Sequence, residues 1–227
     1  MSLNVTKSRK FLNESDNLVI DLTKNSEKFK NLARYEEISE SIKEIVKNTF
    51  GSPSEVHFFG SRVIGVATES SDLDVFLKIN QETHAFDFKA PGLLDKFEKV
   101  TKALNHDSKW LVQQSPYPGL PVIFATFMPM KFDCDINICN GIATGTSKLI
   151  AHLFAIQPEA VKLVHFTRMW FKTQGFDHLK GFTIMLLVVF YLQRKQFLPT
   201  VENVQSEVAK DVCEGKKSNF EIYLACS

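Results

Sequence analysis

The residues best suited to chemistry are three aspartates in two stretches that read as β-strands. Asp72 and Asp74 lie at the start of a predicted strand over 73–79, and Asp135 lies in a second predicted strand over 131–138. Because side chains alternate along a strand, Asp72 and Asp74 face one side, and Asp135 joins them if the strands are neighbours. Three clustered carboxylates repel one another unless divalent cations neutralise them, and hard oxygen ligands favour Mg²⁺. Two such ions, about 4 Å apart, activate an attacking hydroxyl and stabilise a leaving pyrophosphate.

A glycine–serine turn precedes the first two aspartates. The predicted strand 56–59 ends at Gly60 and Ser61, where backbone N–H groups can approach a phosphate without a Cβ in the way. Taken alone, Asp-x-Asp on a strand is often a solvated sheet edge, and Gly-Ser is a common turn. The ordered combination of Gly-Ser, Ser-Asp-x-Asp and a later strand aspartate is far more specific, and it indicates phosphate and metal chemistry.

The elements around these residues predict an α+β protein. Apolar residues three or four apart predict a helix over 26–50 that ends at Gly51-Ser52-Pro53. A second helix is predicted from Pro91 to about Asn105, and more strands are predicted at 110–113 and 122–128, separated by a Pro/Gly loop. From residue 141 on, the sequence predicts helices at 147–154, 158–173, 182–193 and 201–212.

This order of elements predicts two domains. Residues 51–144 form a domain around a small mixed sheet. Residues 23–50 and 145–227 form a helical domain from both ends of the chain, and residues 1–22 are an N-terminal extension. The aspartates and the glycine–serine turn all fall in the sheet domain.

The residues of the predicted site match a known signature. Phe59-Gly60-Ser61, Gly65 and Ser71-Asp72-Leu73-Asp74 resemble the signature of the DNA polymerase β-like nucleotidyltransferases. Within this superfamily, the sequence is most similar to template-independent RNA nucleotidyltransferases, namely cytoplasmic-type poly(A) polymerases and terminal uridylyltransferases. The similarity covers roughly residues 30–200, and it continues through Cys134-Asp135-Ile136, Asn140 and Arg168-Met169-Trp170-Phe171-Lys172.

The resemblance implies a palm-like catalytic domain and a role for each matching residue. The ligands of Mg²⁺ or Mn²⁺ would be Asp72, Asp74 and Asp135, with Asp135 nearest the role of base for the RNA 3′-hydroxyl. The Cys-Asp-Ile context favours Asp135 over Asp133, which shares its strand face and is expected to lie either beside the metal ligands without binding the metal or in solvent.

The same resemblance implies a set of substrate contacts. The triphosphate would be held by Gly60, Ser61, Arg168 and Lys172, of which the last two lie one helical turn apart. The ribose would be contacted by Thr146 and Ser147. Phe182 would stack on the base, although an ordinary core position is the alternative for a phenylalanine in an apolar helix.

Three positions depart from the family pattern. Thr146-Ser147 stands where the family often has Asn-Thr, Gly181 replaces a frequent serine, and Phe182 replaces a frequent tyrosine. Each loss could cost about 1 kcal/mol of binding. Because little sequence follows Pro199, the family's further helical segment, which helps to recognise the base, is expected to be missing, and base discrimination is expected to be weak or supplied differently.

The predicted function is template-independent addition of AMP or UMP to RNA 3′ ends. The alternatives are a weak or inactive module that binds nucleotide, RNA or protein on the same fold, and a related reaction that makes short oligoadenylates or modifies a small acceptor. The sequence does not distinguish ATP from UTP.

Composition excludes several other classes of protein. The chain has 227 residues, of which 44% are hydrophobic and 23% charged, with a net charge of +1, so neither whole-chain disorder nor a strongly basic coat is expected. The four cysteines show no C-x-x-C spacing, and the six histidines complete no zinc pattern. Reduced thiols favour a cytoplasmic protein, with a nuclear one as the alternative.

Two segments bear on membranes and partners. Met1 to Lys10 lacks the apolar stretch of a signal peptide, and the apolar run Phe182 to Leu192 is shorter than the ~20 residues that span a bilayer. No membrane association is therefore expected. Because that run is apolar on nearly all sides, the sequence predicts a homodimer or a protein partner bound through the helical domain.

Overall fold

The computed structural model describes residues 5–79, 92–115, 121–139, 141–176 and 178–206. Backbone contacts divide the chain into two compact units. We call residues 30–148 the sheet unit, and residues 1–29 together with 149–227 the helical unit.

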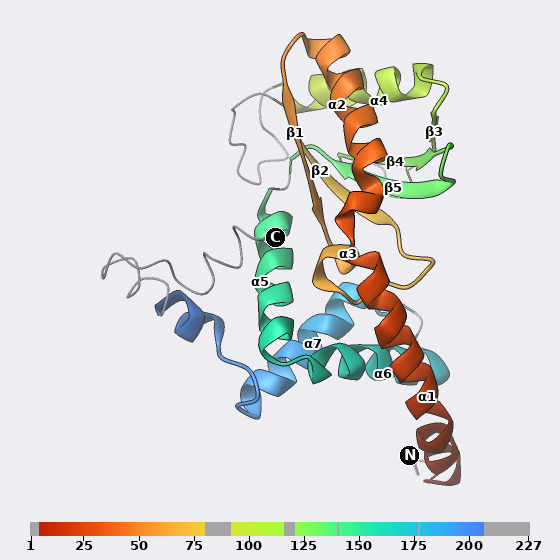
Figure 1. The fold of residues 1–227 in the computed structure, drawn as a ribbon, viewed down its shortest axis with the longest axis vertical. Helices are drawn as coiled ribbons and strands as arrows, with labels where there is room; N and C mark the ends of the chain where they lie inside the picture. The colour runs from red at the N-terminus through yellow and green to blue at the C-terminus, as the bar shows by residue number, and fades with distance from the viewer. Residues whose placement is uncertain (1–4, 80–91, 116–120, 140, 177, 207–227) are drawn as a thin grey trace. The chain divides into compact units, whose positions relative to one another are not determined.

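Within its described residues, the sheet unit contains a five-stranded mixed sheet (Figure 1). In chain order, its strands are β1 (Ser54–Phe59), β2 (Leu73–Ile79), β3 (Trp110–Val112), β4 (Val122–Phe127) and β5 (Phe132–Asn137). In space they follow the order β1-β2-β5-β4-β3, in which β2 and β5 run parallel and the other neighbours run antiparallel. The predicted α+β class with a small mixed sheet is confirmed.

One face of this sheet is covered by two helices, α2 (Glu36–Phe50) and α4 (Leu93–His106). Alternate residues of the three central strands enter the shared core, including Leu73, Val75, Leu77, Ile123, Ala125, Cys134 and Ile136. Because successive side chains of a strand point to opposite faces, the intervening residues of β2 and β5 lie on the face away from these helices. Asp74 and Asp135 are among them, whereas Asp72 lies just before β2.

The helix predicted over 26–50 is divided in the structure. α1 (Val5–Phe29) ends first, and a 3₁₀ turn, η1 (Leu32–Tyr35), leads into α2. α1 contacts α6 (Glu159–Thr173) in the helical unit, whereas α2 packs on the sheet. One amphipathic stretch therefore contributes to two cores.

The predicted helical domain included residues 23–50. In the structure, residues from Lys30 on belong to the sheet unit instead.

The helical unit contains α1, α6 and α7 (Gly181–Arg194), with α6 in contact with both of the others. α5 (Ile142–Ile156) begins in the sheet unit and ends in the helical unit. α6 and α7 agree closely with the helices predicted there, while α5 is longer than expected. Much of the predicted N-terminal extension is part of α1, which begins at Val5.

Some predicted features fall outside the described residues. They are Pro91, most of the Pro/Gly loop, Asn140, Cys213, Cys226 and the second half of the helix predicted at 201–212, which is helical over 201–206. Cys134 and Cys139 are buried free thiols. No helix in the described part of the chain combines the length and apolarity needed to cross a membrane.

Candidate active site

Asp74 and Asp135 are direct partners in the parallel pairing of β2 with β5. Leu73 and Cys134, which pair one residue earlier, are buried in the core. Alternation along the strands therefore directs both carboxylates to the face away from α2 and α4, where each side chain is half-buried. The structure thus brings together aspartates from two distant stretches of sequence, because β5 inserts between β2 and β4.

The turn after β1 packs its backbone against Asp74. Phe59 ends β1 opposite Asp74, and Gly60 follows with a φ of +74°. A Cβ on Gly60 would overlap Oδ2 of Asp74, so this approach requires glycine. Ser61, which begins the short helix α3 (Ser61–Ile64), donates its backbone N–H to Asp74. The turn and the carboxylate therefore form one packed arrangement.

The N–H of Gly60 is engaged by α5. It donates to Oγ of Ser147 over 2.8 Å, and the Ser147 hydroxyl donates in turn to the carbonyl oxygen of Ala143, also over 2.8 Å. Ser147 is only 4% exposed. Thr146 is half-buried, and its hydroxyl donates to the carbonyl oxygen of Ile142 over 3.1 Å in a solvent-exposed bond. Ser147 therefore links the glycine turn to α5, while the Thr146 hydroxyl is bonded within α5.

Burial and mutual repulsion raise the pKa values of the aspartates. Burial, followed by the negative charges of Asp135 and Asp72, raises the pKa of Asp74 to about 7. Burial, followed by the charges of Asp72 and Asp133, raises the pKa of Asp135 to about 6. The pKa of Asp72 is also raised, first by burial and then by Asp133. The site is therefore short of positive charge, and a bound cation would offset the deficit.

The donor chemistry fits a hard divalent cation. Asp74 and Asp135 offer adjacent carboxylate oxygens of the kind that Mg²⁺ and Mn²⁺ prefer, and Asp72 is near enough to raise the pKa of both. In the described ranges, no three His, Cys, Asp or Glu side chains are grouped closely enough to hold a metal as they stand. The ligand set Asp72, Asp74 and Asp135 stays a prediction.

Asp133 is exposed and hydrogen-bonded to its neighbours. It accepts a bond of 2.6 Å from the Thr126 hydroxyl on β4 and one of 3.4 Å from Nε2 of Gln113. Asp133 thus shares the face of Asp135 but is paired with polar side chains over β4, whereas Asp135 lies opposite Asp74.

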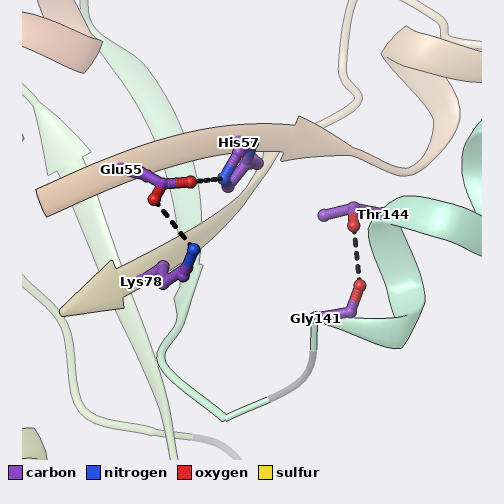
Figure 2. A network of polar contacts seen from close by, with 5 residues as sticks. All are labelled: Glu55, His57, Lys78, Gly141 and Thr144. Carbon is purple, nitrogen blue, oxygen red and sulfur yellow. Dashed lines mark hydrogen bonds and ion pairs between the residues drawn. The ribbon is translucent and has the colours of Figure 1, made fainter. Parts of the chain in front are cut away.

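Elsewhere on the same face, acidic charge is matched by basic groups (Figure 2). Glu55 and Lys78 are cross-strand partners with 2.8 Å between Oε1 and Nζ, and Oε2 of Glu55 lies 3.0 Å from Nε2 of His57. Hydrogen bonds from Lys78 and then from His57 hold the pKa of Glu55 below its usual range. The contrast with Asp74 and Asp135 marks those two as carboxylates whose charge is poorly compensated.

The other predicted site residues lie in the helical unit. Arg168 and Lys172 are one turn apart on α6, and Lys172 is exposed. Burial lowers the pKa of Arg168, whose guanidinium lies against Gly181 so closely that a Cβ there would be 3.0 Å from Nη2. Phe182 is 52% exposed and is therefore not the core residue that its apolar helix allowed.

Two buried polar residues, Arg62 and His165, were not identified from the sequence. Each is only 1% exposed. His165 precedes Arg168 by one turn, its Nε2 has no hydrogen-bond partner within the described structure, and burial together with the Arg168 charge lowers its pKa to about 4. An arginine directly after Gly-Ser, ahead of the apolar Val63-Ile64, was the available signal for Arg62.

The chain is similar in sequence to known proteins. Residues 13–154 match the family described as "Poly(A) RNA polymerase, mitochondrial-like, central palm domain". The chain is 23% identical to Caffeine-induced protein 16 of Schizosaccharomyces pombe, over 90% of this chain and 17% of that protein. It is 24% identical to the mitochondrial Poly(A) RNA polymerase of Homo sapiens, over 71% of this chain and 33% of that protein. The chain thus spans a minor part of the length of both relatives.

Solved structures share the fold. Terminal uridylyl transferase 4 from Trypanosoma brucei with bound UTP and UMP superposes with a TM-score of 0.62 at 19% identity, over 81% of this chain and 61% of that one. mtPAP in complex with ATPγS gives a TM-score of 0.63 at 20% identity, over 80% and 41%. The GLD-2/RNP-8 complex gives 0.60 at 18% identity, over 76% and 65%.

Proposed function

This chain belongs to the family of mitochondrial poly(A) RNA polymerase-like central palm domains, and we propose that it adds AMP or UMP from a nucleoside triphosphate to RNA 3′ ends without a template. The observation that carries the proposal is the direct pairing of Asp74 with Asp135 beside the Gly60-Ser61 turn. Nucleotidyl transfer needs clustered carboxylates next to a phosphate-binding turn, and these residues provide both.

In the proposed reaction, the aspartates orient the attacking hydroxyl and receive its proton. Asp135 accepts the proton of the RNA 3′-hydroxyl, and Asp74 is held in place by the N–H of Ser61 and the backbone of Gly60. Mg²⁺ or Mn²⁺ bound by Asp72, Asp74 and Asp135 would supply Lewis-acid activation of the hydroxyl and neutralise charge on the departing pyrophosphate.

Each unit has its own proposed contacts with the triphosphate, a hydroxyl in the sheet unit and two cations in the helical unit. Because the N–H groups of Gly60 and Ser61 are already bonded to Ser147 and Asp74, phosphate binding at this turn falls to the Ser61 hydroxyl. Arg168 and Lys172 neutralise the β- and γ-phosphates as an electrostatic clamp that is indifferent to the base. Gly60 acts by leaving room for Asp74.

The nucleoside is bound by groups at the surface of the protein. Phe182 offers an exposed ring on which the base stacks, worth about 1–3 kcal/mol per base in comparable sites. Thr146 offers a solvent-exposed hydroxyl to the ribose. Ser147 is buried against Gly60, and its part is to position the turn.

A second candidate is a catalytically weak module that binds nucleotide, RNA or protein. The observation that favours it is the commitment of the Ser147 hydroxyl to Gly60 and Ala143, which removes one of the two ribose contacts expected. Transfer to a small acceptor, or synthesis of short oligoadenylates, would use the same aspartates and differ in the acceptor.

An extension assay separates these candidates. A labelled RNA is incubated with Mg²⁺ or Mn²⁺ and each nucleoside triphosphate in turn, with Asp74→Asn as the inactive control. A ladder of extended RNA in the wild type supports the proposed function, and the triphosphate used reveals the preference for ATP or UTP. Nucleotide binding without extension of any acceptor supports the second candidate and contradicts the first.

We also propose that the helical unit binds a second copy of the chain or a protein partner. The exposed apolar side chains of α7 that support this are Leu186, Leu187, Phe190 and Tyr191. One solved relative is a complex, GLD-2/RNP-8. Light scattering that shows a monomer at micromolar concentration, with no partner recovered, would contradict the proposal. The cytoplasmic location stays a prediction.

A further inference from the structure

Arg62 is the largest of the fully buried side chains in the described structure, with 1% of its surface exposed. Its Nη1 donates to the Tyr35 hydroxyl over 2.8 Å, and its Cζ lies 4.5 Å from the centroid of the Phe132 ring. Burying a guanidinium costs several kcal/mol unless its donors find acceptors. The position of the remaining donors therefore shows what this arginine does.

Those donors hold the segment that leads into β2. Nη2 of Arg62 donates to the carbonyl oxygen of Ser71, and Nε donates to the carbonyl oxygen of Asp72 over 3.3 Å. One planar group thus holds two successive carbonyls, which sets the direction in which the backbone enters the strand. The Asp72 side chain is attached to the backbone that Arg62 holds in place.

A closed turn delivers the chain to Arg62. The N–H of Thr68 donates to Oγ of Ser71 over 2.9 Å, and the N–H of Ser71 donates back to the carbonyl oxygen of Thr68 over 3.1 Å. Ser71 is held by Thr68 within the turn and by the buried Arg62 in the core. Asp72 is therefore placed by contacts on both sides of its backbone.

We propose that Arg62 is a positioning residue for Asp72, which keeps the Asp72 carboxylate beside Asp74 and Asp135. At 1% exposure, Arg62 has no surface to offer to a nucleotide or an RNA, so it acts through the backbone it holds. The consequence for catalysis rests on the proposed function, whereas the placement of Asp72 can be tested without it.

Tyr35 provides a matched comparison. Its hydroxyl accepts one hydrogen bond from Arg62, so Tyr35→Phe removes a buried bond of the same side chain but leaves both carbonyl contacts in place. Ser41→Ala is a second control, because it breaks the buried 3.0 Å bond from Nε1 of Trp110 in the same unit. Both controls lower stability without touching the segment before β2.

The test uses Arg62→Lys, which keeps the positive charge but lacks the planar fork. Hydrogen exchange is followed in the segment 68–73, and Mn²⁺ affinity is measured by electron paramagnetic resonance without nucleotide. We expect faster exchange in that segment and Mn²⁺ affinity about ten- to a hundredfold weaker, as for residues that orient metal ligands, with Tyr35→Phe and Ser41→Ala within about twofold of wild type. In RNA extension, kcat falls while KM for the triphosphate stays within about twofold.

The possible outcomes separate this inference from the proposed function. If Arg62→Lys changes exchange and Mn²⁺ affinity no more than Tyr35→Phe does, Arg62 is an ordinary core residue and the inference is wrong. If the wild type neither binds Mn²⁺ nor extends RNA, the proposed function fails, and the exchange data still decide the placement of Asp72. If Arg62→Lys does not fold, Ser71→Ala loosens the same turn from outside the core, and unchanged exchange in 68–73 would overturn the inference.

Discussion

Oδ2 of Asp74 occupies the space that a Cβ on Gly60 would fill. With φ of +74° and ψ of −155°, Gly60 also adopts a conformation that is nearly exclusive to glycine. The glycine of the turn after β1 and the carboxylate of Asp74 on β2 are thus fitted to each other, and a change in one is expected to displace the other.

Gly60→Ala should therefore displace Asp74. We expect a loss of about 1–3 kcal/mol in the free energy of unfolding from backbone strain, and a fall of about a hundredfold in RNA extension from the misplaced carboxylate. Gly51→Ala is the control, because Gly51 has a φ of +68° but nothing within 4 Å of its Cβ position. Equal activity in the two variants, measured by gel extension, would show that the contact with Asp74 is unimportant.

Asp74→Asn should abolish transfer while changing how stability depends on pH. Burial and the charges of Asp135 and Asp72 raise the pKa of Asp74 from its ordinary value of 3.8 to about 7, so the folded state holds the proton more tightly. Its contribution to stability is present at low pH and is lost as pH rises through about 7. Urea unfolding without divalent cations should thus show a stability gain for Asp74→Asn at pH 8, on the order of 1 kcal/mol, and little at pH 4. A loss at pH 8 would contradict the repulsion described for this site.

Phe182→Ala should weaken binding of every nucleoside triphosphate by about 1–3 kcal/mol, since stacking is tolerant of base identity. The free energy of unfolding should hardly change, because the ring is 52% exposed. Phe190→Ala on the same helix is the matched control, with its ring 62% exposed. Calorimetry that shows the same affinity for both variants would remove Phe182 from the base site.

Gly181→Ser should disturb Arg168, although the family often has serine at this position. A Cβ would lie 3.0 Å from Nη2 of Arg168, so the guanidinium has to move by a few tenths of an ångström. We expect KM to rise for all triphosphates alike, by a factor of about five, which corresponds to about 1 kcal/mol. Gly145→Ser on α5 is the control, because nothing lies within 4 Å of its Cβ position. Tighter binding in Gly181→Ser would mean that the serine hydroxyl contributes a phosphate contact.

His165 should make the helical unit sensitive to acid. Its pKa is lowered from the ordinary value of 6.5 to about 4, because burial and the charge of Arg168 disfavour the imidazolium. Stability is therefore full above pH 6.5 and is lost as pH falls from there toward 4. His165→Phe should flatten this dependence in urea unfolding between pH 7 and 4.5. The exposed His178, replaced by Gln, is the control, and a retained acid loss in His165→Phe would point to other groups.

Local patterns in the sequence predicted those helices and strands whose apolar residues all pack into one core. The alternation of Leu73, Val75 and Leu77 gave β2, and the apolar spacing of α6 and α7 gave those helices nearly to the residue. The break between α1 and α2 could not be predicted from the spacing of apolar residues. That spacing is continuous across the break, although α1 and α2 pack into two separate cores. Long-range pairing decides the strand order, so β5 between β2 and β4 was beyond local reasoning.

The site was predictable to the extent that it follows from order along the chain. Side-chain alternation along the strands and the family resemblance predicted that Asp74 and Asp135 lie close together. In the structure, the two residues are partners in the parallel pairing of β2 with β5. The division of labour between Thr146 and Ser147 was not predictable, because it depends on which hydroxyl meets Gly60. Arg62 was missed since a charged residue is ordinarily assigned to the surface, and only its carbonyl acceptors and aromatic neighbours explain its burial.

The parallel pairing of β2 with β5 also affects when Asp74 and Asp135 come together during folding. Asp74 belongs to a locally formed ribbon, β1 with β2, and Asp135 belongs to another, β4 with β5. Antiparallel ribbons form early, whereas joining two of them in parallel requires closure of a long loop. The two aspartates meet at the seam between these ribbons. A nascent chain is therefore expected to bring Asp74 and Asp135 together last, when the two halves of the sheet unite, so binding of the proposed metal would report completed folding of the sheet unit.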